Sequence, residues 1–263
     1  MLIDSHCHLT SAGLYERVDD VLHRAAEAGV LECITIATGL DDAKRALELS
    51  DSKPNVHVVA GIHPHEAEKV GKRWDEELKT VVAQPDVYAL GEMGLDYHYD
   101  FSDRASQAAV FRRQLEIATD VRKPVVIHCR EAHDDVMRTL HEFPLLVNVV
   151  FHCFTGARRE AEEILAAGYW LSLTGVVTFK KSAKLREVAK MLPADRIMVE
   201  TDSPYLSPEP VRSMRPNEPA NVVHTAACIA RERGISIEEF AALATANTRR
   251  FFSLPCDVAR RRP

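Results

Sequence analysis

The stretch LIDSHCHL, residues 2–9, begins as an apolar β-strand and ends with two histidines that are two residues apart. Alternate residues of a strand point to the same face, so His6 and His8 point together and Cys7 points the other way. Imidazole nitrogens are common ligands of zinc and related metals. The opening of the chain therefore predicts a strand that carries a pair of metal ligands at its carboxyl end.

Seven further β-rich segments follow, and helical stretches separate them. With the first segment, they are residues 2–4, 33–38, 56–61, 87–92, 124–128, 147–152, 169–173 and 197–202. Each interval leaves room for one helix and two loops, which favours parallel strands. Eight such units in 263 residues predict a single-domain (β/α)8 TIM barrel over residues 1–263. A doubly wound open sheet is disfavoured, because no glycine-rich dinucleotide-binding sequence follows the first strand.

Two helix starts can be read from the sequence. Ser102 is expected to cap a helix over residues 104–121. Ser236 and Glu239 have the spacing of a capping box and predict the start of the last helix.

The composition is that of an ordinary globular chain, with 46% apolar and 27% charged residues. A net charge of −6 argues against a protein that coats nucleic acid or a membrane surface. It does not argue against a nuclease in which bound metal ions supply the positive charge. The sequence has no apolar run long enough to cross a membrane. Its six cysteines form no CxxC pair. We therefore expect free thiols in a reducing compartment, the cytoplasm.

Residues of the types that bind metals fall at the ends of the predicted strands. They are His6, His8, Glu92, His128, His152 and Asp202. In a (β/α)8 barrel these ends meet at one mouth, where the active sites of such barrels lie. Six ligands exceed the need of one metal with an open catalytic position, so they predict two divalent ions roughly 3.5–4 Å apart. Cys129 and Cys153 alternate with the histidines and are expected to pack away from the metals.

Seven short motifs are spread over nearly the whole chain. They are DSHCHL (4–9), GIHPH (61–65), GEMGLD (91–96), IHCR (127–130), FHCFTG (151–156), TGVVTF (174–179) and ETDSPY (200–205). In this combination and order, the chain resembles the TatD family of metal-dependent deoxyribonucleases, in the amidohydrolase superfamily. The combination is highly specific, although the His-x-His pair alone is not.

The resemblance implies a role for each ligand. His6 and His8 would hold one metal, and His128 and His152 would hold the other. Glu92 would bridge the two, where other amidohydrolases use a modified lysine. The two ions would be Mg²⁺, Mn²⁺ or Zn²⁺. Four histidines suit zinc, cobalt, nickel or manganese, whereas magnesium prefers oxygen ligands.

Asp202 and Glu92 are the predicted catalytic residues. By the resemblance, Asp202 would bind the first metal and act as general base toward the water that the metals activate. Arg130 lies two residues past His128 and shares its face if the strand continues. Its guanidinium fits a phosphate, and a salt bridge is the alternative interpretation.

Further substrate contacts are predicted near the third and fourth strands. His63 and His65 would contact phosphate or support the ligands, with loop packing as the alternative. Asp4 would orient a ligand. Tyr97 could stack on a base, although we favour an ordinary half-buried tyrosine.

The proline-rich segment after the last strand, residues 203–220, departs from the family pattern. Family members usually carry Arg-Gly-x-Arg-Asn-x-Pro, whereas residues 212–219 read RSMRPNEP. The glycine is absent, and Pro216 stands between the arginine and the asparagine. Glycine adopts backbone angles that serine resists, so the family pattern does not define the path of this loop. Arg212 and Arg215 are still predicted to contact the substrate.

The predicted function is a 3′–5′ exonuclease that cleaves phosphodiester bonds of single-stranded DNA, its substrate. No membrane association and no obligatory protein partner are expected. The residues alone predict metal-assisted hydrolysis, and the bond and polarity come from the resemblance. The alternative is a small-molecule amidohydrolase, lactonase or phosphoesterase with the same binuclear site. A non-enzymatic protein with a structural metal site is a third hypothesis, disfavoured by the complete ligand set.

Overall fold

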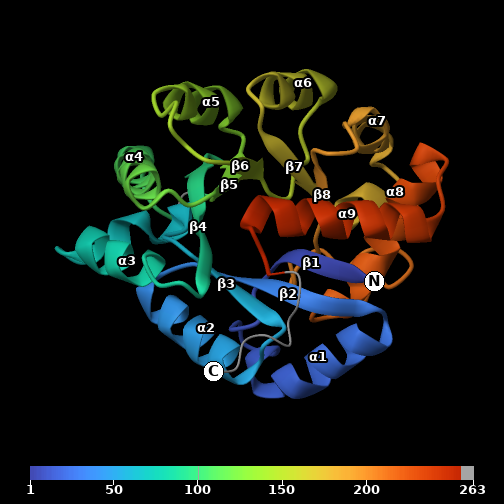
Figure 1. Ribbon diagram of the computed structural model, residues 1–263. Helices are drawn as coiled ribbons and strands as arrows, with labels where there is room; N and C mark the ends of the chain where they lie inside the picture. Colours follow the sequence, from blue (N-terminus) through green and yellow to red (C-terminus); the bar gives the residue numbers. More distant parts are fainter. Residues whose placement is uncertain (100, 256–263) are drawn as a thin grey trace. The chain divides into compact units, whose positions relative to one another are not determined.

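The structure, a computed structural model, describes residues 1–99 and 101–255 (Figure 1). Within these residues, the strands follow chain order in an eight-stranded sheet, from β1 (Leu2–Cys7) to β8 (Ile197–Val199). An α-helix follows each strand. This alternation and this strand order are those of a (β/α)8 barrel, so the predicted fold class is confirmed.

Two compact units can be distinguished along the chain. The first unit comprises Met1–Thr35, Pro54–Val56 and the described part of Cys153–Pro263. Its strands pair in parallel, β1 with β2 (Val30–Ala37, in this unit up to Thr35) and β7 (Trp170–Leu173) with β8. Its α-helices are α1 (Val18–Glu27), α6 (Arg158–Ala166), α7 (Ala183–Met191), α8 (Val222–Arg233) and α9 (Ile237–Phe252). Helix α9 packs on β1 and β8 and buries Phe240 and Phe251 there.

The second unit comprises Ile36–Lys53 and His57–His152. Its parallel strands pair in the order β3 (Val56–Ala60, in this unit from His57), β4 (Val87–Asp96), β5 (Val125–Arg130) and β6 (Val149–Phe151). Its α-helices are α2 (Leu40–Ser52), α3 (Trp74–Val82), α4 (Arg104–Val121) and α5 (His133–His141). Figure 1 shows α4 beside β4, and the helix buries Phe111 and Leu115.

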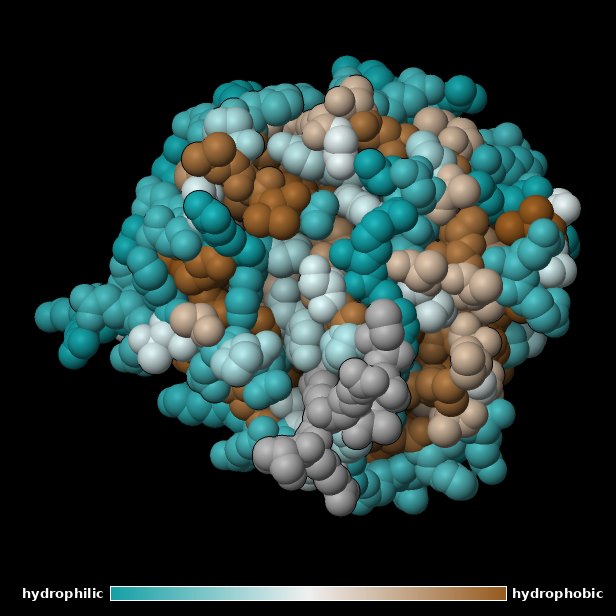
Figure 2. Space-filling view, in the orientation of Figure 1, coloured by the Kyte–Doolittle hydropathy of each residue, from teal (hydrophilic) through white to brown (hydrophobic). Residues whose placement is uncertain are grey.

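The helices are amphipathic because their apolar residues recur three and four positions apart. Helix α1 buries Val21, Leu22 and Ala25 and has Asp19 and Asp20 in its first turn, where a negative charge favours the helix dipole. Hydrophilic side chains cover the outer surface of α3 (Figure 2). Among the described residues, no helix is both long and apolar enough to cross a membrane.

Several predicted strand ends differ from the structure. Strand β4 does not end at Glu92 but continues to Asp96, because its last residues pair with residues 128–130 of β5. Strands β6 and β8 end earlier than predicted, so His152 and Asp202 lie in the loops that follow them. The metal-type residues thus still occur at or just beyond the carboxyl halves of the strands.

One of the two predicted helix starts is confirmed. Ser236 and Glu239 form the expected capping box, with each side chain accepting from the other backbone amide at 3.1 Å. The prediction for Ser102 is wrong. Asp103 caps α4 instead, because it stands directly before the first helical residue and its carboxylate accepts from the amide three residues on. The Ser102 hydroxyl donates to the carbonyl of His65 at 3.0 Å.

Candidate functional site

Two histidines at the end of β1 and an aspartate after β8 form a close group in the first unit. The Nε2 atoms of His6 and His8 are 3.4 Å apart, and they lie 3.7 and 3.4 Å from Asp202 Oδ1. Ligand atoms about 2.1 Å from a tetrahedral metal are about 3.4 Å from one another. The three atoms therefore have the chemistry and the spacing of ligands to one divalent ion.

The loop that carries Asp202 is fixed by hydrogen bonds to β1. The buried carboxylate of Asp4 accepts from the amide and the hydroxyl of Thr201 at 2.9 and 2.5 Å. The amide of Asp202 donates to the carbonyl of His6 at 3.0 Å. Burial raises the pKa of Asp4 to about 8. Asp4 thus holds the residue beside Asp202 rather than a histidine ring.

Three imidazoles converge on one carboxylate oxygen in the second unit. Glu92 Oε1 lies 2.6 Å from His152 Nε2, 2.7 Å from His128 Nδ1 and 3.4 Å from His63 Nε2. Burial alone would raise the pKa of Glu92, but the imidazoles hold it well below its usual value. His128 Nδ1 and His152 Nε2 are 3.4 Å apart, again the spacing of two ligands on one metal. The group therefore fits a bound divalent ion.

Asp96 is a site residue that lies beyond the predicted end of the fourth strand and for which no role was predicted. Its Oδ2 lies 3.0 Å from His128 Nε2 and 2.9 Å from His65 Nε2. Because Asp96 binds Nε2 of His128, the Nδ1 atom of that ring faces Glu92. Burial opposes the charge of Asp96, yet the hydrogen bonds from the two imidazoles keep its pKa below the usual value. An even spacing from Glu92 along one strand was the signal that could have identified it.

His63 differs from the other imidazoles around Glu92 in its hydrogen bonds. Its Nδ1 accepts from the backbone amide of His65 at 3.0 Å, so the proton of the neutral ring lies on Nε2. Burial lowers the pKa of His63 to about 4, which keeps the ring neutral at pH 7. The ring therefore presents an N–H donor toward Glu92, which suits hydrogen bonding better than metal binding.

Helix α4 places two buried glutamines against backbone segments of the second unit. The side chain of Gln114 accepts from the amide of Ile62 at 2.8 Å and donates to its carbonyl at 3.0 Å. In the same way, the side chain of Gln107 accepts from the backbone amide of Asp96 at 2.8 Å and donates to its backbone carbonyl at 3.0 Å. Each side chain thus satisfies both polar backbone groups of a residue at, or next to, the candidate site. Neither glutamine is among the predicted site residues, although their separation by two helical turns places them on one face of α4.

The structure places Arg130 as the last residue of β5, so the strand continues past His128 as expected. The arginine is exposed, and its guanidinium lies 4.6 Å from the ring centroid of Tyr99. His65, half-buried, is joined to the same region through Asp96. The predicted contacts of Arg130, His63 and His65 with substrate remain predictions.

The two arginines of the altered loop, Arg212 and Arg215, contact other residues of the first unit. Arg215 Nη1 donates to the hydroxyl of Ser207 at 2.9 Å and to the carbonyls of Arg212 and Met214 at 3.0 and 2.6 Å. The guanidinium carbon of Arg212 lies 3.7 Å from the ring centroid of Phe179. Both cations thus already have partners, and their predicted contact with substrate stays a prediction.

Asn217 fixes the path of this loop after Pro216. The residue is fully buried, and its Nδ2 donates to the carbonyls of Thr201 and Tyr205 at 3.2 and 2.6 Å. Its own amide donates to the carbonyl of Pro204 at 2.9 Å. The asparagine therefore ties the loop to the backbone on both sides of Asp202.

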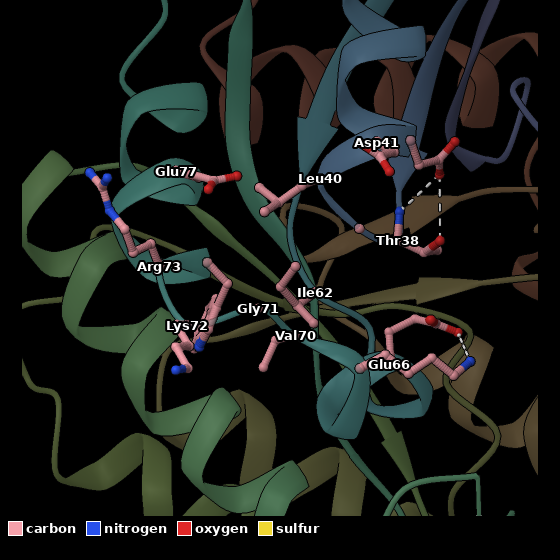
Figure 3. Close-up of a pocket in the computed structure, with 14 residues that line it drawn as sticks. Thr38, Leu40, Asp41, Ile62, Glu66, Val70, Gly71, Lys72, Arg73 and Glu77 are labelled. Atoms are coloured by element: carbon pink, nitrogen blue, oxygen red, sulfur yellow. Dashed lines mark hydrogen bonds and ion pairs between the residues drawn. The ribbon is translucent and has the colours of Figure 1, made fainter.

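A pocket of about 460 Å³ in the second unit lies between the segments that follow β2 and β3 and the start of α3 (Figure 3). Two of its acidic groups have partners nearby. Asp42 accepts from the amide of Thr38 at 3.0 Å, and Glu66 lies 2.9 Å from Lys69. Among the described residues that line it, none is a predicted metal ligand. The pocket is thus separate from the candidate ligands.

Comparison with known proteins agrees with this chemistry. Residues 3–253 match the family described as TatD related DNase. YcfH of Escherichia coli K12, named as an uncharacterized metal-dependent hydrolase, is 38% identical over 258 residues, 96% of each chain. A protein of Erwinia billingiae named 3′-5′ ssDNA/RNA exonuclease TatD is 36% identical over 260 residues, 97% of this chain and 100% of its own length. The crystal structure of YjjV, a TatD homologue of E. coli K12, matches with a TM-score of 0.92 and 29% identity, covering 97% of this chain and 98% of that chain.

The family match and the relatives both extend over almost the entire chain. The predicted family and enzyme class are thereby confirmed. This chain belongs to the TatD family of related DNases and is a metal-dependent hydrolase.

Proposed function

We propose that this hydrolase is an exonuclease that removes nucleotides from the 3′ end of single-stranded DNA. The observation that carries the proposal is the convergence of three imidazoles on the buried carboxylate of Glu92. Of these groups, Glu92, His128 and His152 are donors suited to a metal that assists hydrolysis of an electrophile. The substrate and the polarity are supported by relatives named 3′-5′ ssDNA/RNA exonuclease.

The proposed site holds two divalent ions, with Mg²⁺, Mn²⁺ and Zn²⁺ as the candidates. The proposed ligands are His6, His8 and Asp202 for one ion, His128 and His152 for the other, and Glu92 for both. Support comes from the ligand spacing within each group and from the donor types. His63 is left out because its Nε2 carries the ring proton.

The side chains around the scissile phosphate would each have a separate role in the reaction. Bound divalent ions supply positive charge for the phosphate oxygens and lower the pKa of water. Asp202 accepts a proton from the attacking water and returns it to the leaving oxygen. Arg130 donates hydrogen bonds to a phosphate, and His63 and His65 help to hold the strand.

We also propose that residues 1–263 work as a single domain and that the protein acts in the cytoplasm. The family match over residues 3–253 supports the first proposal. The buried thiols of Cys7, Cys33 and Cys228, which form no disulfide within the described residues, support the second. Cys256 lies outside the described residues.

The test is a time course on 3′- and 5′-labelled single-stranded DNA. Protein stripped with chelator is assayed after addition of Mg²⁺, Mn²⁺ or Zn²⁺, beside an Asp202→Asn variant. We expect metal-dependent loss of the 3′ end, and no loss with the variant. A parallel assay on single-stranded RNA shows whether the sugar matters.

Two results would contradict the proposal. Cleavage from the 5′ end would reverse the polarity and leave the nuclease in place. No cleavage with any metal, by folded protein that binds divalent ions, would favour a small-molecule substrate. Neutral amides, lactones and phosphoesters would then be assayed with the same metals.

A further inference from the structure

We propose that Tyr99 and Phe101, in the segment after β4, form an aromatic platform on which a base of the nucleic-acid strand stacks. The inference rests on the proposed nuclease function and adds a binding subsite to it. The two rings are stacked, with centroids 5.4 Å apart and planes at 12° to each other. The residues are 40% and 61% exposed, so they present aromatic surface to water. A further flat ring can extend this stack.

A cation lies beside the platform. The guanidinium carbon of Arg130 is 4.6 Å from the ring centroid of Tyr99. Exposed rings for the bases and a neighbouring cation for the backbone phosphates are the combination with which proteins bind single strands. Because every base has a π-face, such a platform binds a strand without reading its sequence. The occupant that fits is therefore a nucleobase of an anionic strand.

One carboxylate connects the platform to a proposed metal ligand. Asp96 Oδ1 accepts from the backbone amide of Tyr99 at 3.0 Å, and Asp96 Oδ2 lies 3.0 Å from His128 Nε2. The ring of His65 lies 4.8 Å from that of Phe101, and its Nε2 lies 2.9 Å from Asp96 Oδ2. The platform is thus positioned by the same group that orients His128. A base stacked there would be held beside the reacting end of the strand.

Tyr97, two residues earlier, has a different role. Its hydroxyl donates to Asp135 at 2.7 Å, and the guanidinium carbon of Arg104 lies 4.0 Å from its ring centroid. These contacts are those of a half-buried structural tyrosine, as favoured from the sequence. They leave the base-stacking role to the more exposed Tyr99 and Phe101.

Binding of a strand with bases and of a strand without bases tests the platform. Fluorescence anisotropy is measured with a labelled oligothymidylate and with an abasic strand of equal length, in the presence of Mn²⁺. An Asp202→Asn background keeps the strand from being consumed. We expect the oligothymidylate to bind roughly tenfold more tightly than the abasic strand. Tyr99→Leu and Phe101→Leu should remove most of this difference without weakening the abasic strand.

Two control variants separate stacking from other causes. Phe101→Tyr keeps an aromatic face and should keep the preference for bases. Leu145→Ala removes another exposed apolar side chain, 76% exposed in the loop after α5, and should change neither affinity. Circular dichroism verifies that each variant is folded.

The outcomes separate the platform from the nuclease. The platform proposal is wrong if the Phe101→Leu variant still binds oligothymidylate more tightly than the abasic strand to the full extent. It is also wrong if the Asp202→Asn protein shows no such difference, even where the unaltered enzyme degrades DNA. If the preference depends on both rings but the unaltered enzyme cleaves no strand, the platform stands and the nuclease proposal fails. If the protein neither binds nor cleaves a strand, both are wrong.

Discussion

At the scale of single residues, His128 is held through both of its ring nitrogens. Nδ1 lies 2.7 Å from Glu92 Oε1, and Nε2 lies 3.0 Å from Asp96 Oδ2. Burial favours the neutral ring, but the hydrogen bonds to the two carboxylates outweigh it and raise the pKa of His128. The ring therefore has almost no freedom to rotate. Such restraint keeps a ligand atom in place before a metal or a substrate arrives.

Replacing Glu92 by glutamine tests the carboxylate at which the imidazoles meet. Glu92→Gln keeps the size of the side chain but removes the negative charge that would offset the charge of the bound metal. We expect kcat/KM for the 3′-labelled strand to fall roughly 10²–10³-fold. Glu76→Gln, on the exposed surface of α3, serves as the matched control. Activity within twofold of the parent in a folded Glu92→Gln protein would show that Glu92 has no such role.

Asp96 acts through His128, so its replacement should lower the affinity for metal while the protein remains folded. Asp96→Asn keeps the shape but removes the charged acceptor for His128 Nε2. The expected loss in affinity for Zn²⁺ or Mn²⁺ is roughly 10–100-fold, measured by calorimetric titration. Asp120→Asn, which removes an exposed partner of Lys79, should leave the affinity unchanged. If the unaltered protein and the Asp96→Asn and Asp120→Asn variants all had equal affinity for the metal, the orienting role of Asp96 would be excluded.

At the scale of elements, α4 does more than cover β4. Its apolar residues pack inward, and its two buried glutamines hold the backbone at Ile62 and Asp96. Hydrogen bonds of this kind matter because an unpaired buried backbone group is costly. The helix therefore fixes the two segments that carry His63 and Asp96. Backbone position at the site depends in this way on an element that contributes no ligand.

Gln114→Leu removes one of these contacts and leaves the amide and the carbonyl of Ile62 without that partner. We expect a loss of about 1–3 kcal/mol in the free energy of unfolding, from urea denaturation followed by circular dichroism. Gln84→Leu, at an exposed position after α3, should cost far less. Similar losses in the two variants would mean that the amide contact at Ile62 contributes little.

The extra length of β4 shows where sequence patterns mislead at this scale. Gly91 and Gly94 flank the predicted end of the strand, and glycine usually marks turns. In the structure the strand continues past both glycines and pairs with β5, and a Cβ at Gly94 would meet the carbonyl oxygen of His128. The glycine thus permits close approach of β5 rather than a turn. Only the position of the neighbouring strand reveals this.

At the scale of the whole molecule, bound metal should contribute to stability as well as to chemistry. A ligand at a hundred times its Kd stabilises the folded state by about 2.7 kcal/mol. For a chain of this size, that corresponds to a rise in Tm of about 5–10 °C. We expect Zn²⁺ or Mn²⁺ to raise the Tm of chelator-stripped protein in differential scanning fluorimetry.

A double variant, His6→Ala with His8→Ala, should reduce this rise. His23→Ala, at an exposed position on α1, should not. A stripped protein whose Tm does not respond to any of the metals would argue against a bound ion in the folded state.

The fold could be predicted from the sequence because alternating strand and helix signals extend along the entire chain. The candidate ligands followed from residue type and from position at strand ends. Contacts between segments far apart could not be read in this way. Gln114 is 52 residues from Ile62, and a periodic pattern treats a glutamine as a surface residue. The partners of Arg215 depend on the path of a loop that local sequence does not define.

The hydrogen bonds between Asp4 and Thr201 also bear on how the protein is made. The two residues are 197 positions apart, so the amino-terminal strand leaves the ribosome long before its partner exists. At about 5–20 residues per second, the delay is roughly 10–40 s. During that interval Asp4 has no access to the amide and hydroxyl that later surround it, and its carboxylate stays in water. Assembly of the group around His6 is therefore a late event in biosynthesis, and nascent chains that stop before Thr201 cannot complete it.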